Sequence, residues 1–372
     1  MNTMLLGGNI KRIRKIRGFN QHAVYTASAI SRQAYSNIEN GKSEPKTSTL
    51  IKIAHVLDAD IKDFFVEPVE FHSIRFRTNK INTQKDKMKK EEILMNLSFW
   101  LKNYNYLEEI TNGKQVYCLR NFNNLIPIEL AKKVREKLKL DNDEPIYDIC
   151  NLVNELGIKI FRFECDLDKC FGFSVSEDDE GPVIAVNTYK NISIERQIFT
   201  IAHELGHLLM HKNSYKPELI EEKVNEEKEA DQFAAHFLMP AEGFKKELKK
   251  VSGLHWIGQI LHIKRIYKVS YKTVLRRLID LNLVSNNIYM YFSAEFKRKY
   301  HKDLKKHFEP YSVEPEGMLK SDFVNKRLNK LVRIAYEKEL ITLNRASEIL
   351  SLPLIEMKEL TSSWNEIKYA TN

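Results

Sequence analysis

The segment that most constrains this chain is an apolar run, residues 196–211, that is interrupted by two histidines and a glutamate. His203, Glu204 and His207 form the pattern H-E-x-x-H. On an α-helix, residues four apart share a face, so both imidazoles can bind one Zn²⁺ ion. Glu204 can then reach a metal-bound water as general base. Burying these polar groups among apolar neighbours is costly unless a partner such as a metal ion pairs them.

A catalytic zinc ion takes three protein ligands and one water, so a third ligand is needed. Residues 227–240 (EKEADQFAAHFLMP) predict a helix with acidic residues on one side. Glu227 is the preferred ligand and Glu229 the competing one, while Asp231 can accept the outer N–H of a ligating histidine. Two further histidines lie nearby, and we expect them at a helix end or on the surface: His211 and His236.

The two blocks 196–211 and 227–240 together resemble the ImmA/IrrE family of bacterial zinc metallopeptidases. The resemblance implies a minimal gluzincin-like hydrolase domain with a thermolysin-like fold. It also implies the roles of four residues: zinc ligands His203, His207 and Glu227, and general base Glu204. Members of the family cleave, or provoke cleavage of, a repressor protein and so switch on stress responses or mobile-element genes.

The residues before the first block predict a small sheet. A helix that ends at Gly157 precedes a strand, and residues 171–175 (FGFSV) and 182–187 (PVIAVN) predict two more strands around an acidic turn. Because a peptide can bind by adding a strand to the edge of a sheet, we expect strand 182–187 to be the edge that pairs with an extended substrate.

Near the N-terminus, residues 9–65 predict about five short helices. Ser31 is a suitable N-cap for the third of them, and Gly41 ends it. If its apolar residues face a core, the outward positions carry residue types that read bases and phosphates in the major groove. These positions are Arg32, Gln33, Ser36 and Asn37.

Residues 31–45 (SRQAYSNIENGKSEP) and 49–65 resemble the repressor-like XRE (Cro/C1-type) helix-turn-helix family. The resemblance implies that the second and third helices bind double-stranded operator DNA. The contact candidates it implies are Gln21, Arg32, Gln33 and Ser36. The second helix lacks the usual acidic-then-Leu-Ala pattern, so a helix-turn-helix that serves only protein–protein contacts is the alternative.

Net charge changes along the chain and indicates domain boundaries. It is +5 over residues 1–66, +6 over 67–140, −12 over 141–245 and +10 over 246–372. We therefore expect a helix-turn-helix domain, a basic helical connector, the zinc metallopeptidase domain and a helical C-terminal domain that senses a signal or docks substrate. The fold class that follows is mainly α, with a small sheet (α+β).

Within the connector, apolar residues from Ile93 to Leu107 recur at spacings of three and four and predict one long amphipathic helix. Its apolar stripe needs a partner. We expect it to pack against the following domain, and self-association into a homodimer is the alternative. A dimer would suit a helix-turn-helix protein, because two-fold proteins bind paired half-sites.

The four cysteines are scattered, which indicates free thiols in a reducing compartment. No window approaches the ~18 apolar residues of a membrane helix, so we expect a soluble, cytoplasmic protein with no membrane partner. The sequence favours a DNA-bound, zinc-dependent endopeptidase that cleaves a repressor or antitoxin. The alternative is a non-catalytic transcription regulator whose metal-binding domain senses a signal or a partner.

Overall fold

In the computed structural model the chain divides into two compact units. The structure describes residues 2–65, 70–76, 83–119, 125–167, 170–215, 224–302, 304 and 314–370. The first unit comprises Met1–Val69, Ser98–Gly113 and Arg327–Asn372, and the second comprises Glu70–Leu97 and Lys114–Lys326. The predicted connector and the predicted C-terminal segment therefore each contribute residues to both units.

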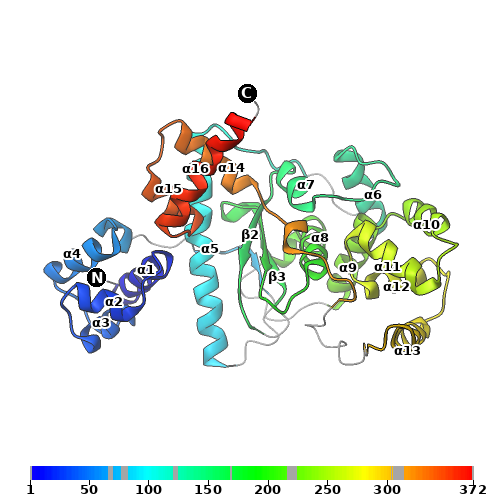
Figure 1. Cartoon of the computed structure of the whole chain (residues 1–372), viewed down its shortest axis with the longest axis horizontal. Helices are drawn as coiled ribbons and strands as arrows, with labels where there is room; N and C mark the ends of the chain where they lie inside the picture. The colour runs from blue at the N-terminus through cyan, green and yellow to red at the C-terminus, as the bar shows by residue number, and fades with distance from the viewer. Residues whose placement is uncertain are drawn as a thin grey trace. The chain divides into compact units, whose positions relative to one another are not determined.

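The first unit contains the helix-turn-helix bundle, drawn in blue in Figure 1. Its elements are α1 (Thr3–Ile16), α2 (Gln21–Ala27), α3 (Arg32–Glu39), α4 (Thr47–Leu57) and the 3₁₀ helix η1 (Ile61–Phe65). The first helix begins earlier than the apolar pattern predicts, because the Asn2 side chain caps it by accepting the Leu5 N–H. Ser31 caps α3 by accepting the Ala34 N–H, as its position in the sequence indicated.

The other regular elements among the described residues of the first unit are helices. It contains the C-terminal part of α5 (Gln84–Ile110) together with α14 (Arg327–Glu337), α15 (Leu343–Leu350) and α16 (Leu354–Ala370). Tyr104 and Leu107 of α5 are buried in one cluster with residues such as Leu331 and Ile349. This part of the amphipathic stripe thus packs against helices from the C-terminal end of the chain, a partner that local periodicity could not identify.

The second unit is built on a four-stranded sheet with the order β1-β3-β4-β2. The strands are β1 (Ile74–Arg75), β2 (Lys159–Phe163), β3 (Gly172–Val175) and β4 (Val183–Asn187). Strand β4 pairs in parallel with β2 and antiparallel with β3, and β1 pairs antiparallel with the outer side of β3. The expectation that PVIAVN forms the free edge of the sheet is wrong, because β4 lies inside it.

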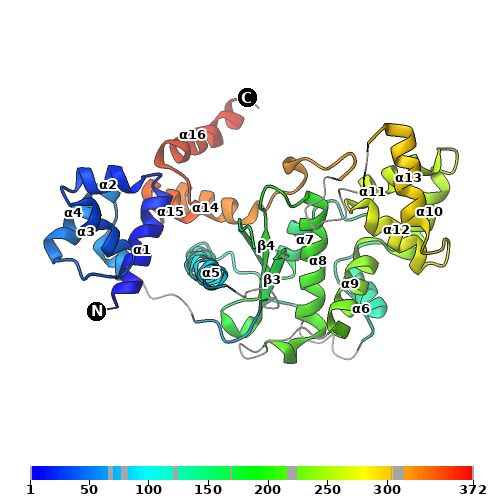
Figure 2. The same cartoon turned by 90° about the horizontal axis from the view of Figure 1, so that it is seen from below.

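Two long helices form successive layers on one side of this sheet. Helix α8 (Ile194–Met210) contacts β3 and β4, and α9 (Val224–Leu238) packs along α8. Figure 2 shows α8 between the sheet and α9. Ser193 caps α8 by accepting the Arg196 N–H, which fixes where the helix begins. Because α8 is covered on both sides, nearly all of its residues are buried.

Further helices complete the second unit around one apolar core. They are α6 (Pro127–Lys137), α7 (Ile149–Glu155), α10 (Ala241–Lys250), α11 (Trp256–Tyr267), α12 (Tyr271–Asp280) and α13 (Ile288–Tyr300), with the 3₁₀ helices η2 (Glu177–Asp179), η3 (Lys212–Ser214) and η5 (Lys320–Asp322). The expected mainly α fold with a small sheet is confirmed. Among the described residues, no helix is both long and apolar enough to span a bilayer.

Candidate metal centre

Three side chains from two helices converge in the second unit. His203 and His207 lie on one face of α8 and are only 4% and 1% exposed, and Glu227 comes from α9. The two Nε2 atoms are 3.0 Å apart, and the Glu227 carboxylate oxygens lie 3.3 Å from His203 Nε2 and 3.2 Å from His207 Nε2. Ligand atoms of a tetrahedral zinc ion stand about 3.3 Å apart, so this spacing fits one.

Hydrogen bonds on the outer nitrogens set the tautomers of both histidines. His203 Nδ1 lies 2.8 Å from Asp231 Oδ1, and because a carboxylate only accepts, Nδ1 carries the proton. His211 likewise donates from Nε2 to Glu229 at 2.9 Å, so its Nδ1 accepts the Nδ1–H of His207 at 2.8 Å. In the neutral rings, both Nε2 atoms then present lone pairs toward each other.

This arrangement fits a metal ion on chemical grounds. Two lone pairs that face each other at 3.0 Å cannot hydrogen-bond to one another, and a carboxylate adds further electron pairs beside them. A cation between the three groups resolves that repulsion. Burial also lowers the pKa of His207 well below its ordinary value, which keeps the ring neutral and available as a ligand.

The other acidic residue and histidines that the sequence left open have different partners. Glu229 contacts His211 rather than the donor cluster of His203, His207 and Glu227. His211 is the C-cap of α8, but it is buried rather than exposed at the surface. The i+4 repeat of three histidines along α8 could have indicated this role. His236 contacts the buried guanidinium of Arg277.

Glu204 lies one residue from the first ligand and is held by two residues that the sequence did not single out. Ser174 on β3 donates its hydroxyl to Glu204 Oε2 at 2.7 Å, and the Tyr215 hydroxyl lies 2.7 Å from the Ser174 oxygen. Burial raises the pKa of Tyr215 well above its ordinary value, so the phenol keeps its proton and donates it to Ser174. The available sequence signal was a polar serine within the apolar strand segment FGFSV.

Arg75 on β1 brings a positive charge to the same centre. Its guanidinium lies 2.8 Å from Glu226 and 2.9 Å from Glu227, and Ser214 donates to the other oxygen of Glu226 at 2.7 Å. Burial opposes the charge, but the ion pairs with these two carboxylates outweigh it and raise the pKa of Arg75. The sequence placed Arg75 in the expected basic helical connector, and no local pattern linked it to the donor cluster.

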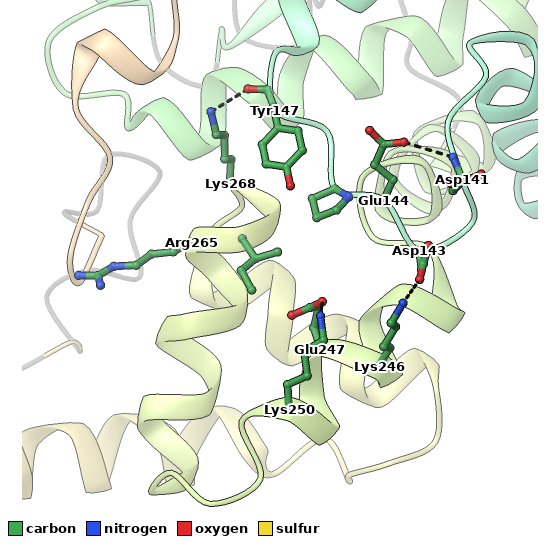
Figure 3. A pocket seen from close by; sticks show the side chains of 11 residues that line it. Asp141, Asp143, Glu144, Tyr147, Lys246, Glu247, Lys250, Arg265 and Lys268 are labelled. Atoms are coloured by element: carbon green, nitrogen blue, oxygen red, sulfur yellow. Dashed lines mark hydrogen bonds and ion pairs between the residues drawn. The ribbon is translucent and has the colours of Figure 1, made fainter.

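Two cavities of similar volume are lined by described residues of the second unit. One of about 560 Å³ is lined by residues that include Arg196, Phe199 and Asp231, so it borders the carboxylate that holds His203. The other, of about 540 Å³, shares no residue with the donor cluster (Figure 3). Its charged side chains pair locally, as Lys246 does with Asp143, and Lys268 donates to the Tyr147 carbonyl at 2.7 Å.

In the first unit, the predicted DNA-contact residues lie on and beside α3. Arg32 and Gln33 are exposed, while Ser36 and Asn37 are half-buried. Gln21, at the start of α2, donates instead to Glu39, which forms a buried ion pair with Arg14. Gln21 therefore joins helices of the bundle and is not a freely presented side chain.

Comparison with known protein families supports both of the family resemblances seen in the sequence. Residues 10–64 match the family described as Helix-turn-helix, and residues 153–279 match the peptidase family M78, described as IrrE N-terminal-like domain. No curated protein matches the sequence significantly.

Two of the solved structures that match are distant from this chain in sequence. A PrgX/iCF10 complex is 13% identical, with 98% of this chain and 97% of that chain covered and a TM-score of 0.16. ComR from Streptococcus suis is 12% identical, with 97% and 96% covered and a TM-score of 0.17. Similarity at this level does not indicate a shared overall arrangement. The chain thus combines a segment that matches the XRE-type helix-turn-helix family, residues 10–64, with a segment that matches the ImmA/IrrE-like domain of peptidase family M78, residues 153–279.

Proposed function

We propose that this protein is a DNA-bound, zinc-dependent endopeptidase that cleaves a repressor or antitoxin and so derepresses stress or mobile-element genes. The observation that supports it most is the convergence of His203, His207 and Glu227 beside Glu204. Each histidine is fixed in the tautomer that a ligand needs, and Glu204 is fixed by the hydroxyl of Ser174.

The residues of the site have distinct tasks in this reaction. A zinc ion, when bound, would supply the Lewis acid that polarises the scissile carbonyl and activates water. His203, His207 and Glu227 would hold it, with Asp231 and His211 keeping the histidine rings in place. The Glu204 carboxylate takes the proton of the attacking water and passes it to the leaving amine.

The surroundings of the site suit a polypeptide substrate. The cavity of about 560 Å³ that borders Asp231 offers room for side chains on one side of the donor cluster. Residues 141–245 carry a net charge of −12, which would attract a basic protein. DNA-binding repressors are commonly basic, so the charge agrees with the proposed substrate class.

Cleavage can be tested with a purified repressor, taken from a gene next to this one where such a gene exists. The purified protein loaded with zinc should cut it into defined fragments, detected by mass spectrometry. His203→Ala should abolish cleavage and stoichiometric zinc binding, whereas His255→Ala, a change at a half-exposed histidine outside the donor cluster, should keep both. An uncut repressor with a fully zinc-loaded protein would instead favour a regulator whose metal-binding domain senses a signal or a partner.

DNA binding by the first unit needs its own test. Arg32→Ala combined with Gln33→Ala removes two exposed side chains from the N-terminal turn of α3. This double variant should lose the specific gel shift on the DNA upstream of the gene, because such side chains read base edges. Lys52→Ala on the exposed side of α4 is the matched control. An unchanged shift would make the bundle a protein-interaction module.

A further inference from the structure

Strand β3 carries the residue that contacts Glu204, and the outer edge of this strand is the edge that faces away from β4. Ser174 in this strand donates to Glu204, so a polypeptide paired along this edge lies beside the general base. The edge is occupied by residues 70–76 of the same chain, named here the strap. Its strand β1 pairs antiparallel with β3 and places Arg75 opposite Ser174.

The strap makes the backbone contacts of a bound extended peptide. The Ser73 carbonyl accepts the Ser176 N–H at 2.9 Å, and the Ser73 N–H donates to the Asp179 carboxylate. Addition of a strand to a sheet edge is a common mode of peptide binding, in which the main chain gives affinity and alternate side chains give specificity. Only two residues of the strap are strand, so few hydrogen bonds must break to release it.

Side chains of the strap alternate between two environments. Ile74 and Phe76 are buried, and the Phe76 ring packs on Phe173 of β3 with centroids 4.6 Å apart. Arg75 points to the opposite face, where it is 12% exposed and forms ion pairs with Glu226 and Glu227. The edge therefore binds an apolar–basic–apolar sequence, with the basic residue held by carboxylates next to Glu204.

The charge of Arg75 makes the strap a competitor of the catalytic centre. Its guanidinium takes an oxygen of Glu227, the same carboxylate that approaches both histidines. Two cations that share one partly buried carboxylate repel each other, so a metal ion and Arg75 weaken each other's hold on Glu227. Displacement of the strap would both relieve the repulsion between Arg75 and the metal ion and free the outer edge of β3.

We propose that the outer edge of β3 is the substrate-binding edge, that the strap occupies it as an internal substrate mimic, and that substrates present an extended apolar–basic–apolar segment that must displace the strap. The proposal rests on the peptidase function proposed above. It accounts for a peptidase that stays latent until a substrate or a signal removes residues 70–76 from the edge.

The test uses the full-length chain with Glu204→Gln, so that a bound peptide is not cut. The probe is a fluorescein-labelled peptide with the sequence of residues 70–76, EFHSIRF, and fluorescence anisotropy measures its binding. Three proteins that carry Glu204→Gln are compared. The first has an intact strap, and the second has a strap weakened by Arg75→Ala with Phe76→Ala. The third is a control with Arg162→Ala on β2, the opposite edge strand.

The protein with the weakened strap should bind the peptide at least about tenfold more tightly than the protein with the intact strap. The reason is that the tethered strap competes with the peptide at an effective concentration of about millimolar. The Arg162→Ala control should behave like the intact protein. A peptide with alanine at the arginine position should bind more weakly. If the double variant does not fold by circular dichroism, Arg75→Ala alone, which keeps both apolar contacts, should give the same direction of change.

The proposal would be overturned if the proteins with intact and weakened straps bound the peptide with equal affinity, or if neither bound it. A loss of zinc affinity in Arg75→Ala would also overturn it, since Arg75 would then support the metal site. These outcomes are separate from the proposed activity, because peptide binding is measured without cleavage. If wild-type protein cleaves the repressor, Arg75→Ala with Phe76→Ala should speed that cleavage several-fold.

Discussion

Replacement of His211 by alanine probes the hydrogen-bond relay behind the zinc ligands. His211 links His207 to Glu229 and is 5% exposed at its side chain. Its removal leaves the Nδ1–H of His207 without its acceptor in a buried position, and it also frees the ring to rotate or to take the other tautomer. Both changes weaken His207 as a metal ligand without touching a donor atom.

The size of the effect follows from that burial. An unpaired buried donor costs about 1–3 kcal/mol, which corresponds to roughly a 10- to 100-fold loss of zinc affinity, the range typical of lost outer hydrogen bonds on ligating histidines. Asp231→Asn should cost less, about tenfold at most, because the Asp231 side chain is 62% exposed and water can replace its contact with His203. We therefore also predict that His211→Ala loses more zinc affinity than Asp231→Asn.

Zinc affinity can be measured by competition with a chromophoric chelator at fixed pH. His255→Ala is the control for loss of a histidine, and circular dichroism should show unchanged helix content in all variants. Wild-type affinity in His211→Ala would refute the reasoning, because the tautomer of His207 would then not depend on this relay. A larger effect from Asp231→Asn than from His211→Ala would refute the role assigned to burial.

Two further predictions concern residues that hold the site and the bundle. Ser174→Ala removes the hydroxyl that positions Glu204, so kcat should fall about tenfold with zinc content unchanged, since a hydrogen bond to a charged group contributes about 1.5–3 kcal/mol. An unchanged kcat would exclude a positioning role. Glu39→Gln leaves Arg14 buried without its charge partner, which should lower the free energy of unfolding by about 3–5 kcal/mol in urea titrations. Burial alone would raise the pKa of Glu39, but hydrogen bonds from Arg14 and Gln21 outweigh it and lower the pKa. This stabilisation is therefore present above the ordinary glutamate pKa of about 4.3 and is lost as pH falls through the lower, folded value. Wild-type protein should accordingly show a steeper acid decline in stability than Glu39→Gln, and equal slopes would contradict the assignment.

Local sequence patterns correctly predicted the features of the protein that depend on helix periodicity. The four-residue spacing of His203 and His207 fixed their shared face, and the acidic block 227–240 supplied the carboxylate that the structure brings beside them. The helix-turn-helix and the fold class also followed from local patterns, because capping residues and apolar spacing act within a few turns.

Contacts between distant segments could not be predicted in this way. Ser174 meets Glu204 only because β3 packs on α8, and Arg75 reaches Glu227 only because β1 pairs with β3. The strand order depends on pairing across the whole unit, so a single strand pattern could not show that β4 lies inside the sheet. The assignment of PVIAVN to the edge failed for this reason.

The most direct test of the account is Glu204→Gln in the full-length, zinc-loaded protein. Gln keeps the size of the side chain and its contact with Ser174, but it cannot take a proton from water. Zinc content and the specific gel shift should stay at wild-type values, while cleavage of the substrate repressor should fall by at least about 100-fold, the lower end of general-base catalysis. Cleavage at the wild-type rate by this variant would contradict the claim that this centre is a peptidase active site with Glu204 as its base.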